Sequence, residues 1–197
     1  MKIRHSTPKT ILAALAVLTV PAAAFAAPVA SSVAGSSAAP RTTVTSCPSG
    51  WGSLPESNSR MVQSPVTGVR TGRHACYDRL VIDLRGRSAG YDVRYVGTVR
   101  QDGSGAAVPL RGDARLQVVV RAPSYSAAGT PTYTPANGRE LANVTGYSTF
   151  RQVAFAGSFE GQTTIGLGVR ARLPFRVFTL AGPGSNTRLV VDVAHRW

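Results

Sequence analysis

Arginine side chains carry the most specific chemistry in this sequence. A guanidinium group offers a planar set of donors that pairs bidentately with phosphate or carboxylate, and it stays charged at physiological pH. Four arginines stand where apolar and polar residues alternate, and we take them as candidates for binding an acidic polymer: Arg79, Arg94, Arg176 and Arg188. The alternative is that they pair with Asp83, Asp92 and Asp192 and only solubilise the protein.

A catalytic site is not predicted. The Gly-x-Ser-x-Gly motif of serine hydrolases does not occur, and His195 stands almost at the end of the sequence. Glu160 is the best isolated acid, but no convergent polar partners accompany it. His74 and His195 are not joined by a carboxylate cluster, so neither a zinc site nor another metal or cofactor is expected. We therefore expect a non-enzymatic protein.

The N-terminus has the three parts of a secretory signal peptide. A positively charged stretch, an apolar run and a small-x-small cleavage site follow one another within residues 1–26. The apolar run is too short to span a bilayer, so we predict a secreted protein that begins near Ala27 and has no membrane span. Loss of Lys2, Arg4 and Lys9 from the 22 basic residues leaves 19, all arginine, against nine acids, which gives a formal charge of +10.

Two short segments separate this leader from the predicted domain. Residues 27–46 are almost wholly Ala, Ser, Val, Thr, Pro and Gly, a composition typical of a flexible, disordered tether. Cys47 and Cys76 form an even pair in an oxidising compartment and predict one disulfide, which would stabilise the fold by about 3 to 4 kcal/mol. Because Pro and Gly interrupt residues 47–76, we expect them to be irregular, with regular structure beginning just after Cys76.

The rest of the chain alternates with period two, as half-buried strands do. Strands are predicted over residues 79–84, 91–96, 108–110, 116–120, 150–156, 163–169, 175–180 and 189–193. Short strands at close spacing indicate an all-β fold, a single antiparallel sandwich or barrel. Residues 124–149 break the rhythm and predict a long loop, whose three tyrosines either line a ligand groove or pack the loop against the domain.

Two strand sequences repeat one pattern. Residues 79–84 read Arg-Leu-Val-Ile-Asp-Leu and residues 188–193 read Arg-Leu-Val-Val-Asp-Val. In each, the Arg and the Asp lie four apart and project from the same outward face, where they can meet opposite charges on a neighbouring strand. We expect the two strands to be equivalent elements of two similar sheets.

The order of several motifs resembles the AMIN-like domain of actinobacterial envelope proteins, a relative of the AMIN module that precedes cell-wall amidases. The resemblance rests on residues 77–84, 90–96, 157–161, 165–167, 174–178 and 188–195. Its motif residues include Tyr77, Asp78, Asp83, Tyr91, Phe159, Glu160, Gly161, Phe175, Asp192 and His195. The resemblance implies a β-sandwich of two similar sheets over residues 69–197.

By analogy with AMIN modules, the resemblance also implies a cell-wall partner, namely peptidoglycan or another wall polysaccharide. The competing hypothesis is a secreted inhibitor or assembly factor that presents the 124–149 loop to another envelope protein. Nucleic acid is an unlikely partner, because no recognised nucleic-acid module accompanies the positive charge. The sequence thus predicts a secreted protein associated with the cell wall.

Overall fold

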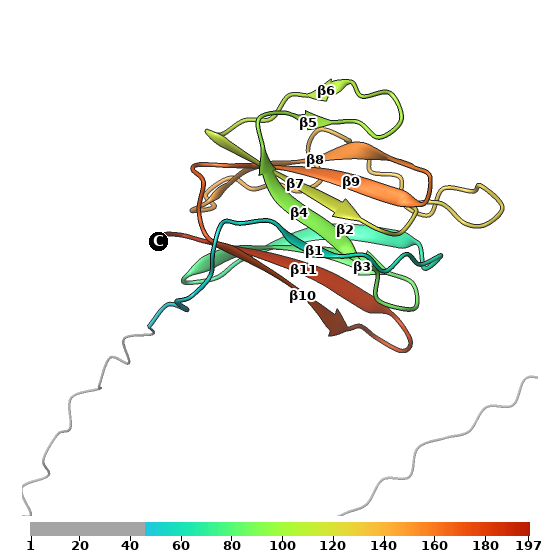
Figure 1. Ribbon diagram of the computed structural model, residues 1–197, viewed down its shortest axis with the longest axis horizontal. Helices are drawn as coiled ribbons and strands as arrows, with labels where there is room; N and C mark the ends of the chain where they lie inside the picture. Colours follow the sequence, from blue (N-terminus) through green and yellow to red (C-terminus); the bar gives the residue numbers. More distant parts are fainter. Residues whose placement is uncertain (1–45) are drawn as a thin grey trace, which may run out of the picture. The chain divides into compact units, whose positions relative to one another are not determined.

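The computed structural model describes residues 46–197, which form β-strands and loops without a helix (Figure 1). The strands are β1 (Glu56–Asn58), β2 (Val66–Arg73), β3 (Tyr77–Leu84), β4 (Tyr91–Val96), β5 (Val99–Arg100), β6 (Ala107–Val108), β7 (Ala114–Val120), β8 (Phe150–Phe159), β9 (Gln162–Val169), β10 (Phe175–Ala181) and β11 (Thr187–Ala194). The predicted signal peptide and residues 27–45 of the predicted tether lie outside the described residues.

Two antiparallel sheets make up the domain. Sheet A has the order β10-β11-β3-β2, and sheet B has the order β1-β4-β7-β9-β8. A two-stranded sheet of β5 and β6 lies beyond sheet B (Figure 1). The prediction of an all-β antiparallel sandwich of two sheets is confirmed.

The core lies between sheets A and B. Alternate residues of every long strand point into it, and the largest of these buried side chains have at most 1% of their surface exposed to solvent. Sheet A contributes Leu80, Ile82, Leu84, Leu189, Val191 and Val193, and sheet B contributes Leu116, Val118, Val120, Ile165, Leu167 and Val169. Burial of these side chains, at roughly 1.5 to 3 kcal/mol each, is the main force that holds the sheets together.

The two repeated strands are neighbours in one sheet. β3 and β11 pair antiparallel in a register that sets Arg79 opposite Asp192 and Asp83 opposite Arg188. The expectation that they belong to two different sheets is therefore wrong, although their outward charges do meet across a ladder. The reason is that both strands have apolar residues facing inward and an Arg and an Asp facing outward. When two such strands pair antiparallel, the Arg of each strand lies opposite the Asp of the other.

The prediction that residues 47–76 are irregular is wrong for β1 and β2. A β-bulge between Val66 and Gly68 shifts the register of β2 against β3, so Val66 and Val69 both face the core. The bulge breaks the period-two pattern that would have marked the strand. Gly68 and Gly72 further weaken its strand propensity.

Two glycines of β9 let a loop lie against the outer face of sheet B. A Cβ atom built on Gly168 would lie 2.0 Å from the carbonyl oxygen of Arg111, and one built on Gly166 would lie 2.9 Å from Cδ1 of Leu110. Leu110 packs there with Val99 and two alanines of β8 in a small second core. Of the strand predicted over residues 108–110, only Val108 lies in a strand, at the end of β6. Leu110 instead packs over the outer face of sheet B.

The open sides of the sandwich are closed by two segments. On one side, the chain from Cys47 to β1 passes β10, where Gly52 accepts a hydrogen bond from the Phe175 amide at 2.8 Å, and then pairs with β4. The Glu56 carboxylate of β1 accepts a hydrogen bond from the Val177 amide of β10 at 3.1 Å. We call residues 47–58 the strap, because they join an edge of sheet A to an edge of sheet B.

The 124–149 loop closes the other side. It bonds to the edge strand of sheet B, where Gly138 accepts from the Phe155 amide at 2.7 Å. It also reaches the edge strand of sheet A, where the hydroxyls of Tyr147 and Thr71 lie 2.9 Å apart. Tyr133 and Tyr147 pack against the core. Of the two predictions for the loop's tyrosines, packing against the domain is the one the structure supports for these two.

Removal of the disulfide should destabilise the domain. The bond between Cys47 and Cys76 confirms the predicted pairing and closes a loop with a sequence separation of 29. In the chain-entropy model such a bond contributes about 3 to 4 kcal/mol. We expect the Cys47→Ser/Cys76→Ser variant to lose that amount in the free energy of unfolding, measured by urea denaturation. An unchanged midpoint would show that the strap is held by its backbone bonds alone.

The carboxyl of Glu56 should make stability depend on pH. Desolvation by burial raises its pKa, and the hydrogen bond from Val177 only partly offsets this. The folded protein therefore holds this proton more tightly than the unfolded chain does. Wild-type stability should fall as pH rises from below 4.5 through the raised pKa.

The Glu56→Gln variant keeps an acceptor for Val177 but cannot ionise. We expect its free energy of unfolding, relative to wild type, to rise over that pH window when urea denaturation is repeated at each pH. Parallel curves for the two proteins would contradict the assignment.

Candidate functional site

Three of the four candidate arginines lie on the outer face of sheet A. In one row across the strands, Asp192 of β11 stands between Arg176 of β10 and Arg79 of β3. Arg79 donates to both carboxylate oxygens, at 2.6 and 2.9 Å, and Arg176 donates twice to Oδ2, at 3.0 and 2.8 Å. Two guanidinium groups thus cover one carboxylate, and the Asp192 side chain has no solvent exposure. This group keeps a net charge of +1.

A second group of the same composition lies further along the same strands. Arg70 of β2 binds both oxygens of Asp83, at 2.8 and 2.9 Å, and Arg188 of β11 lies 3.7 Å from the same carboxylate. Gly68 stands directly opposite Asp83, and its missing side chain leaves room for Arg70 to reach the carboxylate from the next row. The hydrogen bonds to aspartate raise the pKa of Arg70, as they do that of Arg79. The second group also has a net charge of +1.

The two groups are related by an approximate two-fold axis. It passes between Val81 and Val190, which are opposite each other at the centre of the β3–β11 ladder. Asp83 comes four positions after Arg79 on the strand. At about 3.3 Å per residue, the two groups are therefore about 13 Å apart. A hollow of 220 Å³ lies between them, with both valines in its lining and Arg70, Arg79 and Arg188 at its rim.

Aromatic rings surround the first group. The guanidinium carbon of Arg176 lies 4.4 Å from the ring centre of Trp51 and 4.8 Å from that of Phe178. Arg79 lies 5.2 Å from the ring centre of Tyr77, which stacks on His74 at 4.5 Å. Such cation–π contacts hold both arginines in place. One end of the face is thus rigid and aromatic, whereas the Arg70 side chain at the other end is 53% exposed.

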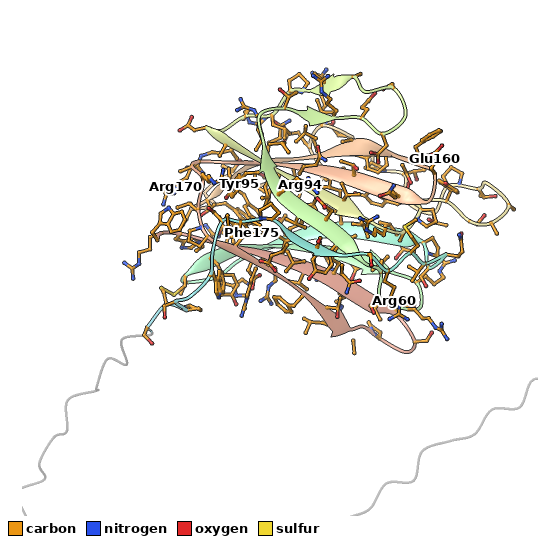
Figure 2. The ribbon with its side chains drawn as sticks, viewed as in Figure 1. Arg60, Arg94, Tyr95, Glu160, Arg170 and Phe175 are labelled. Atoms are coloured by element: carbon orange, nitrogen blue, oxygen red, sulfur yellow. A yellow bond between two sulfur atoms is a disulfide. The ribbon has the colours of Figure 1, made fainter. Side chains whose placement is uncertain are left out.

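Arg94 does not belong to this face. It projects from β4 of sheet B and pairs with Asp92 two residues before it on the same strand (Figure 2). The prediction of four polymer-binding arginines therefore divides into three that share a surface and one that does not. All four are paired with the aspartates that the alternative named, so any ligand would meet charges that are partly compensated.

Asp78 and His195 join the two sheets from within. Asp78 is fully buried on β3, and its Oδ2 accepts hydrogen bonds from the amides of Thr149 and Phe150 at 2.6 and 3.0 Å. Its Oδ1 lies 3.2 Å from Nε2 of His195. Among the described residues no hydroxyl bonds to His195, so the pair lacks a nucleophile. These two motif residues hold the end of sheet A against the start of β8.

The remaining motif residues shape the fold. Glu160 and Gly161 form the two-residue turn between β8 and β9, with φ of 49° and 77°, as a tight hairpin requires. Glu160 is exposed there and Phe159, beside it, is 50% exposed. Phe175 is buried in the core, and Tyr91 packs against the core. Glu160 is thus a turn residue at the surface, away from the outer face of sheet A.

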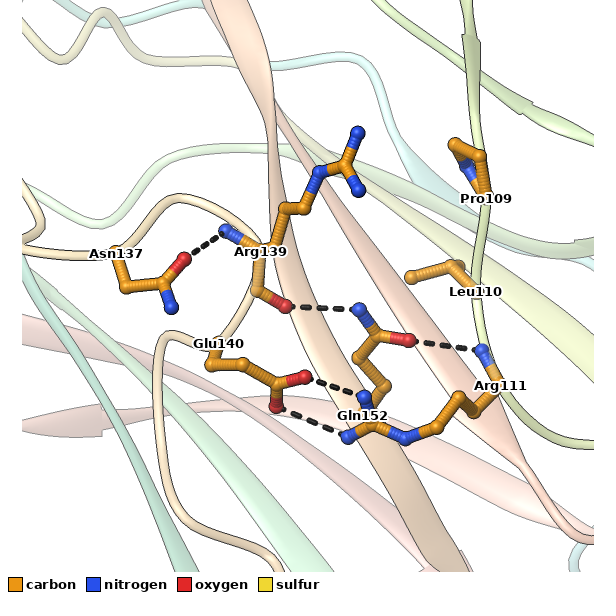
Figure 3. Close-up of a pocket in the computed structure, with 7 residues that line it drawn as sticks. All are labelled: Pro109, Leu110, Arg111, Asn137, Arg139, Glu140 and Gln152. Carbon is orange, nitrogen blue, oxygen red and sulfur yellow. Dashed lines mark hydrogen bonds and ion pairs between the residues drawn. The ribbon is translucent and has the colours of Figure 1, made fainter.

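A hollow of 530 Å³ lies beside the 124–149 loop (Figure 3). Its polar groups are bound to one another: Gln152 accepts from the Arg111 amide at 2.8 Å and donates to the Arg139 carbonyl at 2.9 Å. Arg111 pairs with Glu140 and lowers the pKa of that carboxyl, so Glu140 is a poor general acid. This hollow offers a mixed-charge surface without a free acid–base pair.

Two residues of the outer face were missed by the sequence analysis. Arg70 was not considered because β2 was not predicted. Trp51 lies in a segment that was predicted to be irregular, although a tryptophan four residues after a disulfide cysteine is a signal that could have marked it. Within residues 46–197, no helix could cross a membrane, and no three His, Cys, Asp or Glu side chains come together as metal ligands.

The fold and the paired charges on its outer face define this domain as a β-sandwich module. The AMIN-like domain family matches residues 64–195, and the chain belongs to that family. AMIN-like domains are generally non-catalytic binding modules related to the cell wall, and the disulfide fits a protein outside the cytoplasm. A search of curated proteins finds no match.

The buried carboxylate should matter far more to stability than its surface counterpart. An Asp192→Asn substitution leaves Arg79 and Arg176 facing each other without a counter-charge, which should cost about 3 to 5 kcal/mol. The matched Asp92→Asn change removes the partner of Arg94, whose side chain is 49% exposed, and should cost less than about 1 kcal/mol. Urea denaturation measures both values, and equal losses would show that burial does not decide the outcome.

Proposed function

We propose that this chain is a secreted, non-catalytic module of the bacterial cell envelope that binds peptidoglycan or an associated anionic wall polymer through the outer face of sheet A. The observation that carries the proposal is the pair of Arg–Asp–Arg groups on that face. Each group has one carboxylate for two guanidinium groups, so both retain positive charge and unused N–H donors. Membership of the AMIN-like family supports the cell wall as the location of the ligand.

The roles of the arginines on this face differ. Arg79 and Arg176 cover the buried Asp192 and are held between aromatic rings, so their first role is structural. Arg70 and Arg188 share Asp83, whose side chain is 30% exposed, and Arg188 is beyond hydrogen-bond distance from it. An incoming phosphate or carboxylate can therefore recruit the second pair without uncovering a buried charge. We expect Arg70 and Arg188 to contribute most to affinity.

A protein partner is the second candidate. The 530 Å³ hollow lies between the 124–149 loop and the chain around Arg111, and charged side chains of both signs line it. Such a surface suits another envelope protein better than a polyanion. Salt separates the two candidates, because binding of a polyanion through arginine weakens steeply as ionic strength rises.

Co-sedimentation with isolated sacculi tests the proposal. Mature protein should pellet with sacculi at low salt and be released by salt. The Arg70→Gln/Arg188→Gln variant should bind about tenfold more weakly, a loss on the order of 1.4 kcal/mol, and depend less on salt. The control is Arg94→Gln on sheet B, where the arginine side chain is 49% exposed against 53% for Arg70, and it should bind as wild type does.

Chemical removal of anionic polymers from the sacculi identifies the ligand. Loss of binding after removal would assign the anionic polymer, and retained binding would assign peptidoglycan itself. No pelleting at any salt concentration would contradict wall binding and favour the protein partner.

A further inference from the structure

The two tryptophans of the chain, Trp51 and Trp197, line one hollow of 350 Å³. The Cys47–Cys76 disulfide and Pro174 also line it, and the hydroxyl-bearing Ser46 and Ser49 stand on its N-terminal side. The hollow lies where the start of the strap meets the end of β11. Its volume falls in the range of about 300 to 1,000 Å³ that is typical of small-ligand sites.

Each indole ring has a contact that orients it, although one ring is exposed to solvent. Trp197 is 74% exposed, yet its Nε1 donates a hydrogen bond to the Arg172 carbonyl at 3.2 Å. Trp51 is held by the Arg176 guanidinium at 4.4 Å and by the Tyr77 ring at 5.6 Å. Because an aromatic side chain has few rotatable bonds, such a surface loses little conformational entropy when a ligand covers it.

Trp51 also connects this hollow to the outer face of sheet A. It lines the hollow and contacts Arg176 of the first Arg–Asp–Arg group. A polymer that lies over the arginines can therefore continue into the hollow without a break. The part of the polymer that enters would meet two indoles and two serines near the surface, and the charged side chain that lines the hollow is Arg196.

We propose that this hollow is a sugar subsite that takes one uncharged pyranose ring of a wall glycan; the inference rests on the proposed function and extends it. The C–H face of a pyranose is apolar and stacks on an indole, while its hydroxyls point outward to serine hydroxyls and water. The arginine groups bind the acidic substituents of the polymer and the tryptophans bind its sugar backbone. Recognition by this subsite is largely independent of salt.

Tryptophan fluorescence tests the inference directly, because the chain's two tryptophans both line the hollow. The probe is a neutral series of β-1,4-linked N-acetylglucosamine oligomers added to the mature, oxidised protein. We expect a saturable change in emission with each oligomer, and the dissociation constant should stay nearly the same at high salt. No saturable change with any oligomer would overturn the inference.

Variants locate the binding. Trp197→Ala should weaken oligomer binding at least tenfold by calorimetry, and it leaves the core intact because the ring is exposed. Trp51→Phe keeps an aromatic ring beneath Arg176 and should weaken binding less. Phe159→Ala removes another exposed ring, at the β8–β9 turn, and should bind as wild type does. Wild-type affinity in Trp197→Ala would overturn the assignment.

The two proposals can fail separately. Protein that pellets with sacculi but does not bind neutral oligomers would overturn the sugar subsite and leave the proposed function standing. Protein that binds the oligomers but does not pellet in a salt-dependent way would support the subsite and contradict the arginine face. Protein that does neither would overturn both.

Discussion

The antiparallel register of β3 against β11 is the constraint on which the rest of the structure depends. Val81 opposite Val190 fixes the centre of the ladder, and the inward leucines and valines on either side fill the core. The same register places Asp192 beneath Arg79 and Asp83 beside Arg188 on the other face. A slip of one residue would turn every charge into the core, so packing of the interior and pairing of the surface specify one arrangement together.

This arrangement uses arginine for two purposes on one surface. Where Asp192 is buried, two guanidinium groups compensate its charge, and aromatic rings in turn hold these two arginines in place. Where Asp83 is partly exposed, Arg70 binds both of its oxygens, but Arg188 lies 3.7 Å from it and keeps its donors unused. Paired charges therefore do not argue against binding. They keep long side chains extended over the sheet, which lowers the entropy that a ligand must remove.

The sequence predicted the strands with clean alternation and the disulfide, because these depend on local pattern and on cysteine count. It failed at β2, where the bulge after Val66 and the glycines at 68 and 72 hide the alternation. That failure concealed Arg70, the most exposed arginine of the face. The placement of Arg94 could not be predicted either, since alternation tells which residues share a face of a strand but not which strands share a sheet. Glu160 looked isolated because a tight turn requires it to project into solvent.

The closed sides of the sandwich limit how this domain can meet other proteins. The strap occupies the first half of β10, the 124–149 loop bonds to β8 and β2, and β1 is only three residues long. An exposed strand edge is the usual template for intermolecular strand pairing and for amyloid. Because these edges are short or partly covered, a neighbouring chain finds fewer free backbone groups to extend. Recognition by this domain is therefore left chiefly to the side chains on its faces.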